Sequence, residues 1–189
     1  FVRDILVAAF LGAGPIADTF FVAFKMPNFF RRLFAEGAFN AAFVPLFATK
    51  LTDDGKSSAA QFATAVLSVM VVFLLVFVTG LQIAMPWLMY VFAPGFVDDP
   101  EKFSLAIELT RITFPYLLFI SLVSLLGGVL NSLGRFAAAA ATPVILNIVL
   151  IGAMLLATPH LPSAGHSLAW GVSVAGVAQF LWLVYACRQ

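Results

Sequence analysis

Residues 25–37, with the sequence KMPNFFRRLFAEG, place three cations, a carboxylate and an amide inside a strongly apolar part of the chain. The cations are Lys25, Arg31 and Arg32. Each charge costs roughly 3 kcal/mol at the centre of a membrane helix, so three cations facing lipid tails would cost about 9 kcal/mol. A planar guanidinium matches a pyrophosphate or a carboxylate, so the pattern predicts a hydrated anion site built on the two arginines, with Lys25 as a supporting cation.

Plainer interpretations of these charges remain open. Both arginines could be cations whose long stems reach the membrane surface. Arg32 could pair with Glu36, which lies one helical turn later. Asp18 shares a helical stripe with both of these residues, but its place in the first turn of a helix would by itself explain a carboxylate there.

Pro27 and Gly37 are weak points of the helix expected over residues 16–50. Pro27 has no N–H, so the carbonyl of Ala23 loses its helical donor, and we expect the helix to break near Pro27 with both weak points acting as hinges. Arg31 points about 100° away from Arg32 around the helix. A bend near Pro27 would bring Arg31 toward the other cations. Broken helices at membrane depth are tolerated where they line a hydrated cavity.

The composition is that of a membrane protein. Of 189 residues, 62% are hydrophobic and 10% are charged, and the mean hydropathy is +1.06, whereas soluble domains carry about 25% charged residues. The net charge of +1 predicts no nucleic-acid partner. The single cysteine excludes an internal disulfide. We expect no metal site, with His160 and His166 as solvated residues of an outer loop.

The apolar pattern predicts an all-α polytopic membrane protein, a bundle of six transmembrane helices with short connections. The helices are expected over residues of about 1–11, 16–50, 62–92, 103–130, 136–158 and 167–187. The first run is too short to span a bilayer, so we expect that helix to begin upstream. The polar stretch 51–61 is expected to be a loop, and Glu108 and Arg111 have the spacing of a helical ion pair. Gly171 and Gly176 indicate a surface for close helix contact.

The basic loop residues give an orientation. One side of the predicted bundle carries four of them, and the opposite side carries only Lys102 beside three acidic residues. The four are Lys50, Lys56, Arg135 and Arg188. The positive-inside rule therefore predicts that their side is cytoplasmic, together with the N-terminus and the residue 188 end.

Arg3 and Asp4 are charged residues of the first apolar run. Adjacent residues of a helix point about 100° apart, so we expect the two side chains not to pair fully with each other. They should then find other partners, as parts of a site.

Arg3 and Asp4, followed by GAGPIADTFFVAFKMPNFFRRLFAEGAFNAAFVPLFA from Gly12 to Ala48, resemble the N-terminal signature of the lipid II flippase family (MurJ/MviN). This family belongs to the multidrug/oligosaccharidyl-lipid/polysaccharide exporter superfamily. The motif is long and specific, and the later helices match more loosely in length and order. The resemblance implies a multi-pass protein of the bacterial inner membrane with two lobes around a cationic cavity. This chain is similar to the N-terminal lobe, and the C-terminal lobe, absent here, would be its partner.

The resemblance further implies a role in peptidoglycan and cell-wall biosynthesis, and so in cell shape. The protein would be a transporter rather than an enzyme. By alternating access among membrane lipids, it would carry lipid II, the undecaprenyl-pyrophosphate-linked disaccharide-peptide. No cofactor is expected in this part, and an ion gradient or the membrane potential would supply the energy. The substrate-binding residues would be Arg3, Arg31 and Arg32, with Asp4, Asp18, Lys25, Asn28 and Glu36 as supporting or gating residues.

Two other functions remain open. A related exporter of polyprenyl-linked polysaccharide or of drugs would share the fold, although an exporter of cationic drugs should carry cavity carboxylates rather than arginines. An integral-membrane enzyme acting on polyprenyl pyrophosphate would need an acidic metal-binding cluster or a nucleophile with its base. The sequence shows no such motif.

Overall fold

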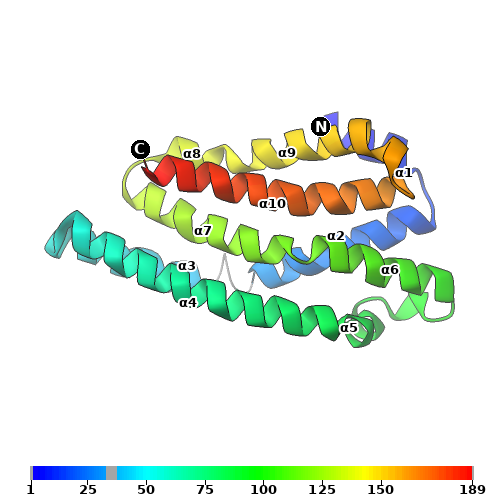
Figure 1. Cartoon of the computed structure of the whole chain (residues 1–189), viewed down its shortest axis with the longest axis horizontal. Helices are drawn as coiled ribbons and strands as arrows, with labels where there is room; N and C mark the ends of the chain where they lie inside the picture. The colour runs from blue at the N-terminus through cyan, green and yellow to red at the C-terminus, as the bar shows by residue number, and fades with distance from the viewer. Residues whose placement is uncertain (1, 33–37, 189) are drawn as a thin grey trace.

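The computed structural model describes residues 2–32 and 38–188, and this part of the chain is a bundle of helices without strands (Figure 1). The main helices run roughly along the longest axis of the molecule. The elements are α1 (Val2–Leu11), α2 (Pro15–Arg31), α3 (Ala38–Asp53), α4 (Gly55–Ile83), α5 (Met85–Phe92), η2 (Pro94–Phe96), α6 (Pro100–Thr113), α7 (Tyr116–Ser132), α8 (Phe136–Ala140), α9 (Thr142–Gly152), η3 (Ala153–Ala157), η4 (Thr158–His160) and α10 (Ala164–Arg188). The predicted all-α fold is confirmed.

Helix α10 lies at the centre of the packing. It contacts α2, α6, α7 and α9, while α3 and α4 form a hairpin that packs on α7. A Cβ atom on Gly171 would lie 2.8 Å from the Cβ of Ala153, and one on Gly176 would lie 2.8 Å from Cδ2 of Tyr116. These two positions of α10 therefore require glycine because the neighbouring helices approach so closely, as is common between membrane helices.

Four segments are long and apolar enough to cross a membrane: Gly55–Ile83, Pro100–Ser132, Phe136–His160 and Ala164–Arg188. The chain is therefore a multi-pass membrane protein. Helix α1 has only 10 residues, and α2 and α3 are separated by residues that the structure does not describe. For this reason the expected count of six spans is not reached within the described residues.

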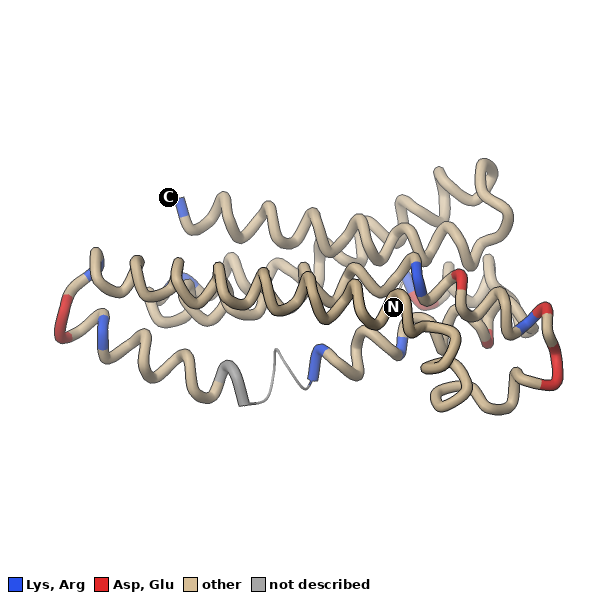
Figure 2. The backbone as a smooth tube through the Cα atoms, turned by 60° about the horizontal axis from the view of Figure 1, so that its bottom comes forward, with Lys and Arg blue, Asp and Glu red and all other residues tan. Residues whose placement is uncertain are grey.

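The two ends of the bundle carry different connections. The α3–α4 turn, the α7–α8 turn and the C-terminus lie at one end, which is on the left in Figure 1. The α1–α2 turn, the α5–α6 connection and the η4–α10 turn lie at the other. Charged residues gather at both ends of the backbone trace (Figure 2). We refer to these as the α3–α4 end and the α5–α6 end.

The break that we expected near Pro27 is wrong. Helix α2 continues through Pro27 to Arg31, so the interruption of this region falls later. The carbonyl of Ala23, which Pro27 deprives of its donor, accepts a hydrogen bond from Thr113 Oγ1 of α6 at 2.9 Å. A neighbouring hydroxyl replaces the missing N–H, which is how membrane helices tolerate proline. Gly37, the second expected hinge, lies outside the described residues.

The expected loop at 51–61 is also wrong. Helix α3 runs to Asp53 and α4 begins at Gly55, so the reversal takes place around Asp54. Lys50 Nζ lies 3.1 Å from Asp54 Oδ2 and links the last turn of α3 to this residue. Polar residues outside an apolar stretch remain compatible with helix, so polarity alone misplaced both helix ends.

Two of the long helices that we expected are divided near prolines. The helix expected over 62–92 separates into α4 and α5 just before Pro86, and that expected over 103–130 separates into α6 and α7 at Pro115. The cause is the one we had assigned to Pro27, the loss of an N–H and a clash with the preceding turn. The two carbonyls that these prolines leave without a helical donor, those of Gln82 and Arg111, also find side-chain donors. Arg111 Nε donates to the first at 3.3 Å and Gln82 Nε2 donates to the second at 2.8 Å.

His166 is not a solvated loop residue, because α10 begins before it and buries it to 7% exposure. Its Nδ1 lies 2.8 Å from Ser163 Oγ, and its Nε2 lies 3.3 Å from Glu108 Oε1. The expected ion pair between Glu108 and Arg111 gives way to this contact, and Arg111 Nε donates to the carbonyl of Gln82 at 3.3 Å. Glu108 and Arg111 therefore each contact a residue distant in sequence, instead of the helical neighbour that their spacing suggested.

Candidate functional site

The last three turns of α2 line a hollow of about 510 Å³. Its lining combines three cations, one amide and three aromatic rings: Lys25, Arg31, Arg32, Asn28, Phe21, Phe24 and Phe29. Residues three and four apart share a helix face, so the sequence itself places most of this set side by side. The structure therefore brings together the three cations and the asparagine that the sequence singled out.

Asn28 joins the helix backbone to the guanidinium of Arg31. Its Nδ2 donates to the carbonyl of Phe24 at 2.8 Å, and its Oδ1 accepts from Arg31 Nε at 3.3 Å. The first contact holds the amide group to its own helix, and the second orients Arg31 from it. Asn28 is thus placed to hold the half-buried Arg31 side chain in one direction.

Arg31 also borders a second hollow, which measures about 470 Å³. Its wall is formed by α3, α7, α8, α9 and α10, and the polar side chains in that wall are Ser124, Asn131, Ser132 and Thr142. Arg31 therefore lines both the cationic hollow and this second hollow of mixed polar and apolar lining. The polar wall of this cavity comes from helices in which we had predicted no site residue.

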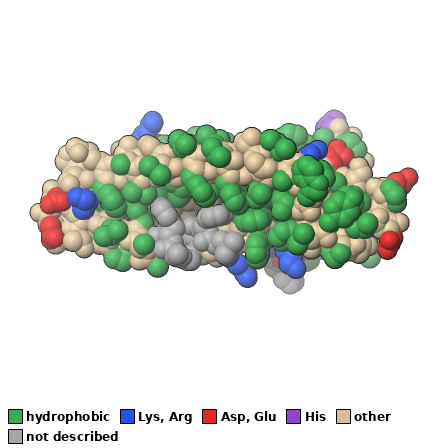
Figure 3. Space-filling view, turned by 90° about the horizontal axis from the view of Figure 1, so that it is seen from below, with side chains coloured by type: hydrophobic (Ala, Val, Ile, Leu, Met, Phe, Trp, Pro, Cys, Tyr) green, Lys and Arg blue, Asp and Glu red, His purple; other side chains and the backbone are tan. Residues whose placement is uncertain are grey.

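The end of α2 lies about midway along the bundle, away from both polar ends (Figures 1 and 2). Figure 3 shows cationic side chains projecting at one edge of the molecule, near the middle of its length. Phe30, which precedes Arg31, packs edge-on against Phe77 and Phe114 with ring centroids 5.5 and 5.8 Å away. An aromatic cluster therefore holds the cationic end of α2 about midway along the bundle.

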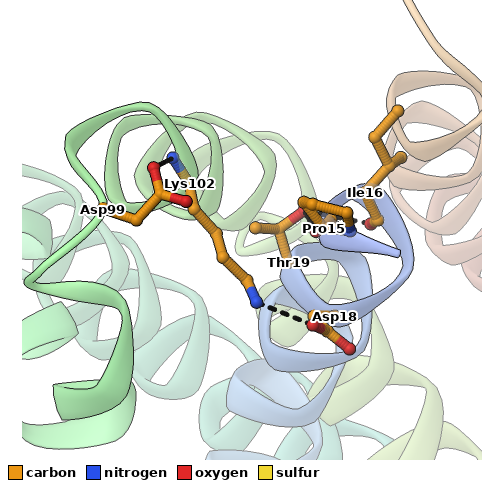
Figure 4. Close-up of polar contacts among 6 residues, drawn as sticks. All are labelled: Pro15, Ile16, Asp18, Thr19, Asp99 and Lys102. Atoms are coloured by element: carbon orange, nitrogen blue, oxygen red, sulfur yellow. Dashed lines mark hydrogen bonds and ion pairs between the residues drawn. The ribbon is translucent and has the colours of Figure 1, made fainter. Parts of the chain in front are cut away.

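Asp18 lies in the first turn of α2, at the end opposite to the cationic hollow, and its side chain faces Lys102 (Figure 4). Its Oδ2 accepts from Lys102 Nζ at 2.7 Å, and that ammonium also lies 4.4 Å from the centroid of the Phe96 ring. Lys102 N donates to Asp99 Oδ1 at 3.1 Å, which caps α6. Asp18 thus ties the start of α2 to the start of α6. Its place in the first turn of α2 did not reveal Lys102 as its partner.

Arg3 and Asp4 pair with each other, contrary to our expectation. Arg3 Nη2 and Nε donate to Asp4 Oδ1 at 2.6 and 2.9 Å. The long arginine side chain folds back and spans the angle that separates adjacent helix positions. Helix α1 packs on α9, η3 and α10, and neither residue lines either hollow among the described residues. The structure therefore does not bring Arg3 together with Arg31 and Arg32.

Glu36 lies outside the described residues. We did not foresee the hydrogen bond of Thr113 to α2, because Thr113 reaches α2 only through tertiary packing. Pro115, two residues later, is a helix breaker, but no sequence pattern indicates which carbonyl a buried threonine will reach. The same holds for Ser124 and Thr142 in the wall of the second hollow.

The sequence profile of the family described as lipid II flippase MurJ matches residues 7–189. The chain belongs to the lipid II flippase MurJ family. The resemblance recognised in the motif of residues 12–48 is thereby confirmed over nearly the whole chain.

Curated members of the MurJ family support this assignment. The chain is 49% identical to the probable lipid II flippase MurJ of Rhizobium tropici, over 98% of this chain and 35% of the relative. It is 44% identical to that of Rhizobium meliloti (strain 1021), over 100% of this chain and 36% of the relative. It is 42% identical to the lipid II flippase MurJ of Burkholderia cenocepacia, over 95% of this chain and 35% of the relative. The chain thus spans about a third of the length of the curated MurJ proteins it matches.

A solved MurJ structure shares the fold. The structure described as lipid II flippase MurJ in an inward closed conformation matches with a TM-score of 0.81 at 28% identity. The match covers 98% of this chain and 38% of that one. The helical arrangement around the cationic end of α2 is therefore that of one part of a MurJ protein.

Proposed function

We propose that this chain is part of a lipid II flippase of the bacterial inner membrane. The observation that carries the proposal is the hollow about midway along the bundle where α2 presents Lys25, Arg31 and Arg32 beside three phenylalanines. A diphosphate crossing the bilayer loses its hydration, and fixed guanidinium groups replace that hydration with charge-assisted hydrogen bonds. The aromatic side chains offer apolar surface to the polyprenyl chain.

In this proposal Arg31 and Arg32 meet the pyrophosphate, while Lys25 and Asn28 support them. Arg3 and Asp4, which neutralise each other in this conformation, would join the site only after separating. Rocking of this lobe against the C-terminal lobe would expose the hollow to one side of the membrane at a time, driven by an ion gradient or the membrane potential. The process requires no covalent step, as for a transporter rather than an enzyme.

Complementation tests the proposal directly. The full-length protein is expressed in a bacterium depleted of its own flippase, and both growth and the export of lipid-linked precursor are measured. We expect rescue of both. Growth without restored export would contradict the flippase assignment, as would failure of a correctly inserted protein to restore either.

The orientation can be tested separately with cysteine labelling. We propose that the α3–α4 end and the residue 188 end face the cytoplasm, because Lys50, Lys56 and Arg188 gather there. In full-length protein freed of other cysteines, including Cys187, we expect Glu101→Cys to react with a membrane-impermeant maleimide on intact spheroplasts. Lys56→Cys should react only after permeabilisation. Both sites are exposed in the structure, so the reverse pattern would overturn the orientation.

A further inference from the structure

Thr113 is a fully buried polar side chain at the last position of α6. Its Oγ1 lies 2.9 Å from the carbonyl oxygen of Ala23 in α2 and 3.1 Å from the carbonyl oxygen of Thr110 in its own helix. A hydroxyl donates a single hydrogen. The shorter contact leads to a carbonyl 90 residues away along the chain, so the hydroxyl links two helices.

The carbonyl of Ala23 is the one that Pro27 leaves without a helical donor. Ala23 is completely buried, so water does not reach this position from outside. An unpaired carbonyl in such surroundings favours opening of the turn, because bending exposes the oxygen to some other donor. The next turns of the same helix carry Asn28 and Arg31, so any opening at Ala23 swings the cationic end of α2.

The other side of this contact is also a proline junction. Thr113 ends α6, and Pro115 separates it from α7, which begins at Tyr116. The ring of Phe114 packs edge-on against Phe30 of α2, with an interplanar angle of 80°. Two positions weakened by proline therefore face each other in the bundle, and the Thr113 hydroxyl and the Phe30–Phe114 ring pair are among the contacts that join them.

We propose that Thr113 is a positioning residue of the anion site. Its hydroxyl closes the turn of α2 that Pro27 would otherwise leave open and so fixes Arg31 and Arg32 relative to the α6–α7 junction. The consequence for export rests on the proposed function of those arginines. The consequence for the geometry of α2 is independent of that proposed function.

The chain offers a matched control for this inference. Thr110 is equally buried and lies three residues earlier on α6, but its hydroxyl donates to the carbonyl of Ala106 within the same helix, at 2.6 Å. Thr110→Val therefore removes a buried hydroxyl without cutting a link to α2. Thr113→Ser keeps the linking hydroxyl and loses only a methyl group.

The experiment is a double-mutant cycle in the full-length protein, reconstituted in bilayer discs and followed by hydrogen exchange of the α2 amides. Thr113→Val should speed exchange in residues 24–32 by about threefold to tenfold, the range expected for one hydrogen bond between membrane helices. Thr110→Val and Thr113→Ser should leave it within about twofold of the parent. In a Pro27→Ala background, residue 27 regains an N–H for the Ala23 carbonyl, so adding Thr113→Val should change exchange by less than about twofold.

Equal acceleration by Thr113→Val with and without Pro27 would overturn the inference, as would equal effects of Thr113→Val and Thr110→Val. Export by the same variants gives a second, separate result. If Thr113→Val speeds α2 exchange and lowers export, both proposals are supported. If it speeds exchange while substitution of Arg31 and Arg32 leaves export intact, the positioning role stands and the flippase site is wrong.

Discussion

Replacing both Arg31 and Arg32 with alanine in the full-length protein is expected to abolish rescue of a flippase-depleted bacterium. A hydrogen bond to a charged group contributes about 1.5 to 3 kcal/mol, so each arginine lost should weaken diphosphate binding by roughly 10- to 100-fold. The double variant should bind lipid II about 100-fold more weakly or worse, provided each arginine makes at least one such bond. Growth, precursor export and lipid II binding by the purified protein are the measurements.

Lysine substitutions separate charge from shape. Arg31→Lys and Arg32→Lys keep the cation but lose the planar fork that binds two phosphate oxygens at once, so we expect partial rescue. Arg188→Ala and Lys56→Ala remove exposed cations near the α3–α4 end and serve as controls for net charge. Full rescue by the double alanine variant, at normal membrane abundance, would refute the anion site. So would equal damage from the control substitutions.

Enlarging the glycines of α10 is expected to cause the largest loss of stability in this chain. A Cβ at Gly171 would lie 2.8 Å from Ala153 Cβ and 3.2 Å from Leu150 Cδ2, and a leucine there would extend further into η3 and α9. Forcing extra groups into a packed interface costs about 1 to 3 kcal/mol, occasionally more. Gly171→Leu and Gly176→Leu should therefore lower the thermal midpoint of the purified full-length protein and its abundance in membranes.

Gly80 provides the matched control for these two substitutions. It also lies inside a long helix, but a Cβ there would meet nothing within 4 Å. Gly80→Ala should be neutral or stabilising by up to about 1 kcal/mol, because alanine favours helix more than glycine does. If close packing causes the loss of stability at Gly171 and Gly176, the substitution at Gly80 must not cause one. A Gly171→Leu variant as stable as Gly80→Ala would show that α10 does not depend on close contact with its neighbours.

The membrane class, the helical fold and the family follow from the sequence because they rest on composition and local order. Charge-free stretches longer than a bilayer is thick require helices, since the backbone must satisfy its own hydrogen bonds in lipid. The spacing of Lys25, Asn28 and Arg32 places them on one helix face whatever the helix packs against. The motif around them is long enough to identify the family without a structure.

Only the tertiary structure decided which partner each polar group meets. Pro27 suggested a broken helix, but Thr113, 90 residues away, supplies the missing donor and the helix continues. Asp18 finds Lys102, and His166 lies buried against Glu108. Sequence spacing fixes direction around a helix, but the partner across an interface depends on how the helices approach each other. That approach depends on the packing of the whole bundle and cannot be inferred from any single stretch of the chain.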